Sequence, residues 1–294
     1  MSQTMCIAPI LAAIKKTEDI LGAGRIWQAQ NEDQAYFLEH FYKHHNNLSA
    51  YSEQELRSWV SWYASELNEI LAREGSSHHF EEFPPGNFGF LSIRDVLVHW
   101  LEKGAMTKLS YEGNDYPAVY IGNDEVFSAF SVSGHPHPVV CIHTKSGDNV
   151  FMSKSDAAYQ GFGLARKVDT LSLAEMRFLD AASVIFPMIN YDSEKGIPVD
   201  LSFLVGMSTK TSSGDDAAIE EIKQQTKFKK NHEGARVKSF VSGRVSITSV
   251  RMPAQHIVID EPYLEWHTRP GAPLPTFCAY WTPEDWSDPG NLDL

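Results

Sequence analysis

The sequence contains few cysteines, and they are not grouped. Its 294 residues include three, Cys6, Cys141 and Cys278, which lie far apart and form no CxxC pair. An odd number of widely separated cysteines gives no basis for a disulfide framework or for a zinc site made of thiolates. We therefore expect a fold that rests on a hydrophobic core, for which a chain with 43% hydrophobic residues is well supplied.

Positive charge is also scarce. Lys and Arg total 25 against 38 Asp and Glu, which gives a formal net charge of −13, and no window gathers a basic stripe that could follow phosphates. No apolar run reaches the roughly 20 residues of a membrane-spanning helix. The longest early run, 5–14, has its positive charges after it rather than before it, unlike a secretory signal. The composition predicts a cytoplasmic protein whose partners include neither nucleic acid nor membrane.

Motifs for nucleotide binding and for hydrolytic chemistry are absent. The sequence has no GxSxG, no HExxH and no Walker lysine. Its two GxG pairs, at 22–24 and 161–163, lack a third glycine at the spacing that cradles a phosphate, so both predict turns. We expect no cofactor and no bound metal.

One cluster of histidines deserves separate consideration. His135 and His137 flank a proline, and His143 lies in the next predicted strand, where alternation would let two imidazoles share a face and bind a metal. Residues 138–147 hold no Asp or Glu that could complete such a site. We interpret the cluster as a turn. The candidates for ligand binding or proton transfer are His135, His137, His143, Glu265 and His267.

The first third of the chain has helical periodicity. In residues 53–71 apolar side chains recur every three or four positions, and Ser52 with Glu55 resembles a capping box. The apolar positions are Leu56, Val60, Tyr63, Leu67 and Ile70. Residues 93–101 repeat the pattern. Both stretches are predicted helices, and residues 1–107 are expected to be mainly helical.

From about residue 108 the periodicity changes to that of strands. Short β-prone runs broken by Gly, Asn, Asp and Pro are typical of hairpins and meanders. These runs are 118–121, 126–132, 139–143, 149–152 and 182–188. Short helices are expected at 173–180, 200–207 and 216–225. Helices followed by strands, without βαβ alternation, predict an α+β fold around a large, mainly antiparallel sheet.

The last third of the chain contains a series of short motifs. Residues 200–207 are Asp-Leu-Ser-Phe-Leu-Val-Gly-Met, and residues 231–234 are Asn-His-Glu-Gly. Residues 257–266 form an apolar run around Asp-Glu-Pro, and 277–281 are Phe-Cys-Ala-Tyr-Trp, followed by Asp-Pro at 288–289. The order resembles that of the serpin family, in which a short helix, an "NEEG" hinge and two closing strands follow one another.

The resemblance covers roughly residues 180–290 and implies a single serpin-like domain over 1–294. It implies a helical N-terminal part packed on a large, mainly antiparallel β-sheet, with a second, smaller sheet. The two closing strands, 260–266 and 277–281, are predicted to be adjacent, antiparallel and buried, because the proline-rich segment between them can only turn.

By the same resemblance, Glu233 and Gly234 open a reactive-centre loop. Inhibitory serpins insert this loop into a sheet after a protease cuts it, and insertion needs small residues after the hinge glycine. Here the order is Ala-Arg-Val-Lys-Ser-Phe. Alternation places Ala235, Val237 and Val241 on one face, so we predict that residues 235–247 already form a strand of the main sheet.

Three functions stay open. The first is a non-inhibitory serpin-fold protein with a degenerate hinge, whose scaffold binds a small molecule or a protein; the bulky hinge favours it. The second is a working inhibitor of serine or cysteine proteases, with a bait bond near Thr248 and Ser249. The third is a small-molecule biosynthetic enzyme on the same scaffold.

Overall fold

The structure is a computed structural model, and it describes residues 1–76, 78–192, 199–236 and 255–293. The chain divides into two compact units that interleave in sequence. Unit 1 comprises residues 1–5, 95–192 and 226–294, and unit 2 comprises residues 6–94 and 193–225.

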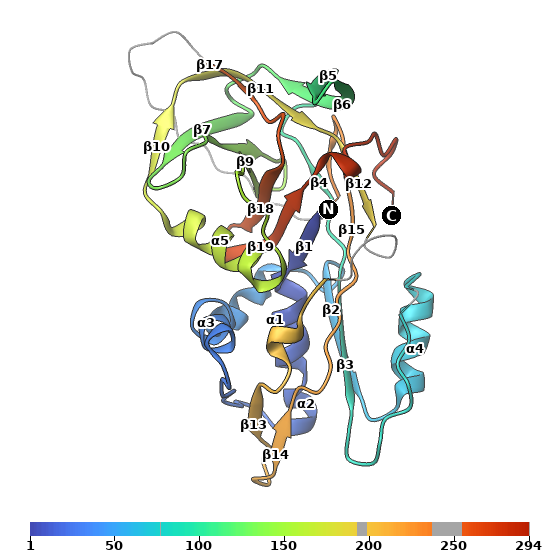
Figure 1. Cartoon of the computed structure of the whole chain (residues 1–294). Helices are drawn as coiled ribbons and strands as arrows, with labels where there is room; N and C mark the ends of the chain where they lie inside the picture. The colour runs from blue at the N-terminus through green and yellow to red at the C-terminus, as the bar shows by residue number, and fades with distance from the viewer. Residues whose placement is uncertain (77, 193–198, 237–254, 294) are drawn as a thin grey trace. The chain divides into compact units, whose positions relative to one another are not determined.

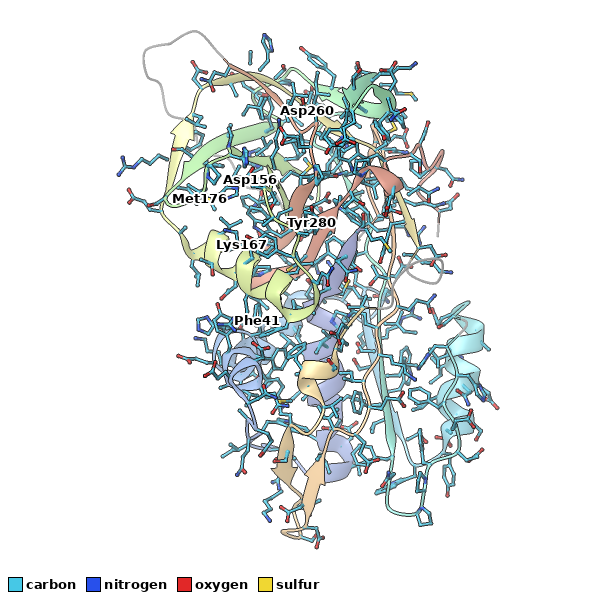
Figure 2. All side chains as sticks on the ribbon, viewed as in Figure 1. Phe41, Asp156, Lys167, Met176, Asp260 and Tyr280 are labelled. Atoms are coloured by element: carbon cyan, nitrogen blue, oxygen red, sulfur yellow. The ribbon has the colours of Figure 1, made fainter. Side chains whose placement is uncertain are left out.

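Unit 1 contains the largest sheet of the described chain (Figure 1). Its order is β1 (Gln3–Cys6), β19 (Ala272–Trp281), β18 (Tyr263–Arg269), β9 (Asn149–Lys154), β8 (Val139–His143), β7 (Phe127–Val132) and β10 (Met176–Leu179). The pairs from β19 to β10 are antiparallel. Helix α5 (Gly161–Leu173) contacts β19. Strand β10 forms one edge, where Figure 2 labels Met176. The predicted α+β class with a large antiparallel sheet is confirmed.

The two closing strands form the best-buried hairpin of this sheet. Tyr263 pairs with Trp281 and Trp266 pairs with Cys278, and all four side chains are buried. The prediction for this pair is therefore confirmed. The strands run further than expected, because Gly271, with φ of 84°, reverses the chain within a much shorter turn than the proline-rich segment predicted.

Two four-stranded sheets complete unit 1. One has the order β17 (Gln255–Val258), β11 (Ala181–Pro187), β6 (Asn114–Ile121) and β5 (Ala105–Tyr111), so the predicted strand at 182–188 is confirmed. The other has the order β12 (Ile189–Asp192), β15 (Lys227–Lys230), β16 (Gly234–Ala235) and β4 (Val98–His99). A short 3-10 helix, η3 (Pro283–Asp285), follows β19.

Unit 2 is built around helix α1 (Ile7–Lys16), whose residues 7–14 are all buried. The helix packs against the antiparallel pair of β2 (Leu56–Ser61) and β3 (Gly89–Arg94). The remaining elements are α2 (Glu18–Leu21), α3 (Glu32–His40), η1 (Tyr42–Ala50), α4 (Ala64–Arg73), η2 (Ser202–Leu204), and the hairpin of β13 (Ser208–Lys210) and β14 (Asp216–Ala218).

The predicted helix at 53–71 is wrong in its first half. Ser52 and Glu55 do make the capping contacts, with the Ser52 N–H donating to Glu55 Oε2 at 2.9 Å, but the chain then enters strand β2. Trp59 pairs with Leu91 across the two strands, and β2 packs on α1. Aromatic and β-branched residues suit this half-buried sheet, so tertiary contacts override the helical spacing. Only α4 remains helical.

Other predicted helices are also wrong. Residues 93–101 belong to β3 and β4, so residues 1–107 are less helical than expected. At 173–180 the helix α5 ends and β10 follows, because β10 completes the pairing of β7. Only the short η2 forms within 200–207, and 216–225 begins with β14, which pairs with β13.

Candidate functional site

The hinge motif of the sequence is a tight turn between β15 and β16. The N–H of Asn231 donates to the Gly234 carbonyl at 2.9 Å, and the N–H of Glu233 donates to Asn231 Oδ1 at 2.8 Å. The indole N–H of Trp100 donates to the Asn231 carbonyl at 3.0 Å. Asn231 and Trp100 are each 1% exposed. Buried donors thus satisfy the backbone at the turn and fix its shape.

The segment after the turn is already part of a sheet. Strand β16 lies between β15 and β4 in a four-stranded sheet and is antiparallel to both. The prediction that this segment joins the main, seven-stranded sheet is therefore wrong for Ala235, because β15 and β4 provide its backbone partners. A Cβ atom on Gly234 would lie 2.0 Å from the Val98 carbonyl oxygen, so this position accepts only glycine. The side chain of Ala235 is completely buried. The first residues after the hinge therefore occupy the space between two strands.

Arg236 is the last described residue of this segment, and several groups hold it. Its N–H donates to the Lys229 carbonyl at 3.0 Å. Its guanidinium donates to both oxygens of Asp95, each at 3.2 Å, and to the Leu292 carbonyl at 3.3 Å. A bidentate Arg–carboxylate pair is among the strongest polar contacts that a side chain makes.

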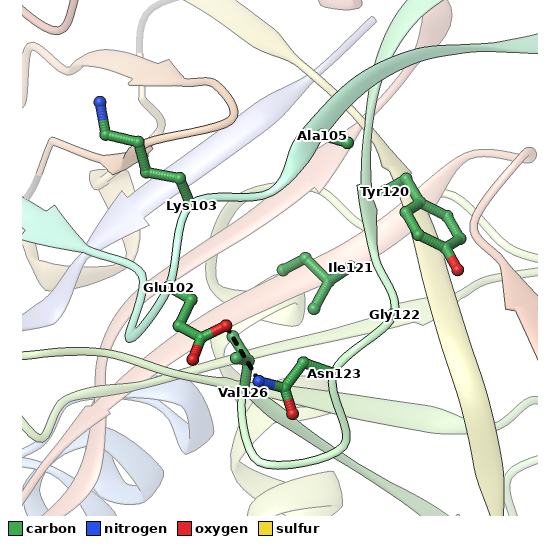
Figure 3. Close-up of a pocket in the computed structure, with 8 residues that line it drawn as sticks. All are labelled: Glu102, Lys103, Ala105, Tyr120, Ile121, Gly122, Asn123 and Val126. Atoms are coloured by element: carbon green, nitrogen blue, oxygen red, sulfur yellow. Dashed lines mark hydrogen bonds between the residues drawn. The ribbon is translucent and has the colours of Figure 1, made fainter.

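A small cavity adjoins the hinge. It has a volume of about 200 Å³, and Figure 3 shows its lining, in which Glu102 accepts a hydrogen bond from the Asn123 amide at 2.9 Å. Lys103 also lines the cavity and forms an ion pair with Glu233 of the hinge. The hydrogen bond from Lys103 holds the pKa of Glu233 below its ordinary value. This contact links the wall of the cavity to the hinge turn.

Behind the hinge lies a completely buried ionisable network. Lys230 Nζ of β15 donates to Glu265 Oε2 of β18 at 2.5 Å, and to the Tyr263 hydroxyl at 2.8 Å. Its third contact is the sulfur of Met152, at 3.4 Å. Burial lowers the pKa of Lys230, and the Glu265 carboxylate opposes that shift. When the amine is charged, each of its three hydrogens has an acceptor.

Glu265 has donors on both of its carboxylate oxygens. The Trp281 indole donates to Oε2 at 2.9 Å, and the His267 Nε2 donates to Oε1 at 3.0 Å. Burial by itself would raise the pKa of Glu265, but the Lys230 ammonium and the hydrogen bond from His267 outweigh it and hold the pKa below its ordinary value. The network thus keeps a carboxylate charged in the core.

The sequence contains a pattern from which this network could have been predicted. Phe228 and Lys230 have the same parity on β15, and Phe228 is fully buried, so Lys230 has to point inward as well. Glu265 similarly interrupts an apolar run. Two opposite charges at buried positions predict a pair.

The predicted proton-transfer residues do not form one site. His135 Nε2 lies 2.7 Å from Ser153 Oγ, and that hydroxyl donates to the Pro138 carbonyl, so the histidine is the donor and cannot activate the serine. Burial lowers the pKa of His135, and Lys167 and His137 lower it further.

The other two histidines have separate partners. His137 Nε2 lies 2.7 Å from Asp156, an acid that Figure 2 labels, and His143 lies between Ser128 and Asn149. Glu265 and His267 do lie together, but both are buried. Within the described residues, no group of three His, Cys, Asp or Glu side chains could hold a metal ion.

Four predicted loop residues, Val237, Val241, Thr248 and Ser249, lie outside the described residues. Glu233, Gly234 and Ala235 lie at the hinge turn and in β16, as described above. The prediction of a strand over 235–247 is met at Ala235, and from residue 237 onward it stays a prediction. No helix in the described part of the chain is long and apolar enough to cross a membrane.

Comparison with known proteins gives matches in structure alone. No protein-family model matches the chain, and no curated protein matches its sequence. The serpin from Schistosoma mansoni matches with a TM-score of 0.52 and 10% identity, over 95% of this chain and 94% of the other. SRPN18 from Anopheles gambiae matches with a TM-score of 0.51 and 9% identity, over 98% and 93% of the two chains.

This chain has a serpin-like fold. The predicted recognition is thus confirmed at the level of the fold. The likeness extends over nearly the whole of both chains, including the N-terminal part, which no sequence motif marked. In this serpin-like chain, the buried network of Lys230 and Glu265 lies directly behind the strand that leads to the hinge.

Proposed function

We propose that this protein is a non-inhibitory serpin-fold binding protein. The hinge carries the proposal: in the uncut chain, Gly234 and Ala235 already pair between β15 and β4. An inhibitor of this fold keeps its loop outside the sheet and releases stored strain when the cut loop inserts. A hinge that is paired before cleavage leaves less of that strain to release.

The next residue supports the same conclusion. To insert further, the chain would have to move Arg236, which makes a bidentate contact with Asp95 and is 16% exposed. A small hinge residue would enter the sheet without breaking such a contact. The sequence beyond it, Val-Lys-Ser-Phe, is bulky as well. We infer that insertion is too slow to trap a protease.

The size of the cavities favours a protein partner over a small molecule. Two cavities of the described chain are each about 200 Å³, whereas pockets for drug-sized ligands measure about 300–1,000 Å³. The second is lined by His137, Lys154 and residues 255–259. A cytoplasmic location stays a prediction from composition.

Incubation with a panel of serine and cysteine proteases tests the proposal directly. We expect cleavage without a covalent complex on a denaturing gel, and a melting temperature that changes little after the cut. An inhibitory serpin run with the same proteases is the positive control. An SDS-stable complex, or a rise in melting temperature of tens of degrees after cleavage, far above the few degrees that one substitution changes, would favour the working inhibitor with a bait bond near Thr248 and Ser249.

A separate experiment distinguishes the enzyme hypothesis from the binding-scaffold hypothesis. Native mass spectrometry of the purified protein would reveal a bound metabolite. Such a ligand, lost on replacement of His135 or His137 by alanine, would favour the small-molecule enzyme over the binding scaffold.

A further inference from the structure

The seven-stranded sheet ends in an edge strand with an exposed aromatic side chain. Among the described strands, β10 has a neighbour on one side, β7, and none on the other. Phe178 of β10 is 75% exposed, with its ring 4.8 Å from that of Phe130. Natural proteins usually protect an edge with charge, proline or a covering element. An unpaired edge that carries a large exposed apolar side chain can pair with a further strand.

The backbone of this edge is oriented for pairing. The N–H of Ser133 donates to the Glu175 carbonyl at 3.2 Å, so Glu175 points its polar backbone groups toward β7. In an antiparallel ladder these directions alternate along the strand. Met176 and Phe178 therefore point their N–H and C=O groups away from β7, where a further strand could bind them.

The sequence of the edge is complementary to itself when reversed. Residues 173–179 are Leu-Ala-Glu-Met-Arg-Phe-Leu, in which Leu173 ends helix α5 and Met176, at the centre, begins β10. Glu175 and Arg177, on either side of it, have side chains that are 68% and 76% exposed and form an ion pair with each other at 3.2 Å, which a second copy could exchange for two pairs between the chains. Beyond them every residue is apolar, and Leu173 is 68% exposed.

We propose that β10 pairs with β10 of a second copy of this chain, antiparallel and around a two-fold axis at Met176. In this register Glu175 lies opposite Arg177 of the second copy, twice by symmetry. Phe178 lies opposite Ala174, and the pairing ends there because Leu173 belongs to helix α5. Contacts across a two-fold axis require one patch that is complementary to itself. An unrelated strand could bind the backbone, but the charge order of this segment specifically matches its own reverse.

The charges of Glu175 and Arg177 provide a test that distinguishes this specific dimer contact from nonspecific association. We expect sedimentation velocity to show a monomer–dimer equilibrium at micromolar concentrations. Arg177→Glu places like charges opposite each other at two points and should raise the dimer dissociation constant by about tenfold or more. Glu175→Arg should do the same. The double swap, Glu175→Arg with Arg177→Glu, should restore the dimer.

A matched control is available on another edge strand. Lys108 of β5 is 75% exposed, and Lys108→Glu makes the same charge change without affecting β10. Because all these side chains are exposed, the thermal melts of the variants should equal that of the parent. A protein that sediments as a monomer at every concentration overturns the proposal. A dimer that Arg177→Glu leaves intact, or that the double swap fails to restore, overturns it equally.

Discussion

Breaking the buried pair of Lys230 and Glu265 should weaken the fold strongly. Glu265→Gln keeps the size of the side chain and removes its charge, which leaves the Lys230 ammonium without a counter-charge in a fully buried environment. Removing one partner of a buried pair destabilises a protein by about 3–5 kcal/mol. For a chain of this size that corresponds to a fall in melting temperature of about 10 °C.

The reciprocal variant, Lys230→Met, and the double variant test whether the loss of stability comes from the unpaired charge. Lys230→Met removes the ammonium and leaves the carboxylate, and it should be nearly as harmful. Combining both changes removes both charges, so the double variant should be more stable than the sum of the single losses predicts. A coupling of about 1–3 kcal/mol is typical for groups in one network. Chemical and thermal unfolding of the four proteins measures this cycle.

The same substitution at an exposed position is the control. Glu261, four residues earlier, is 50% exposed and pairs with Lys154. Glu261→Gln should change stability by about 1 kcal/mol or less, as exposed pairs do. If Glu265→Gln were equally mild, or if the two buried substitutions added without coupling, the network would not be the ionic contact described here.

Three further predictions concern the same region. First, because the folded pKa of Glu265 is lowered, its contribution is present above the unfolded value of 4.5 and lost as the pH falls through the folded pKa; the stability gap between the parent and Glu265→Gln should shrink in acid, and a constant gap would contradict this. Second, Gly234→Ala should destabilise the protein, because the new Cβ would meet the Val98 carbonyl at 2.0 Å, whereas Gly163→Ala in helix α5 has open space and should be neutral or stabilising in the same melts. Third, Arg236→Ala should speed hydrogen exchange at the hinge, since the contacts with Asp95 are lost; unchanged exchange would show that the turn is held without them.

Local sequence patterns are sufficient to predict the structure where residues that contact each other are also close in the sequence. The closing hairpin of β18 and β19 is predicted correctly because both apolar runs and the turn between them lie within one short stretch. The hinge turn is similar, since Asn231 and Gly234 are bonded to each other. The strand at 182–188 is evident from its apolar run alone.

Pairing between residues that are distant in the sequence determines the parts of the fold that local patterns do not predict. Residues 56–61 have helical spacing, yet they form a strand because residues 89–94 pair with them and α1 covers both. Each residue's preference for helix or strand is a fraction of a kcal/mol, and the burial of a whole strand pair outweighs it. Similarly, Lys230 and Glu265 are each visible as a charge in an apolar run, but 35 positions separate them. Only the tertiary fold brings the two residues into contact. A buried charge is stable where a counter-charge and hydrogen-bond partners lie beside it.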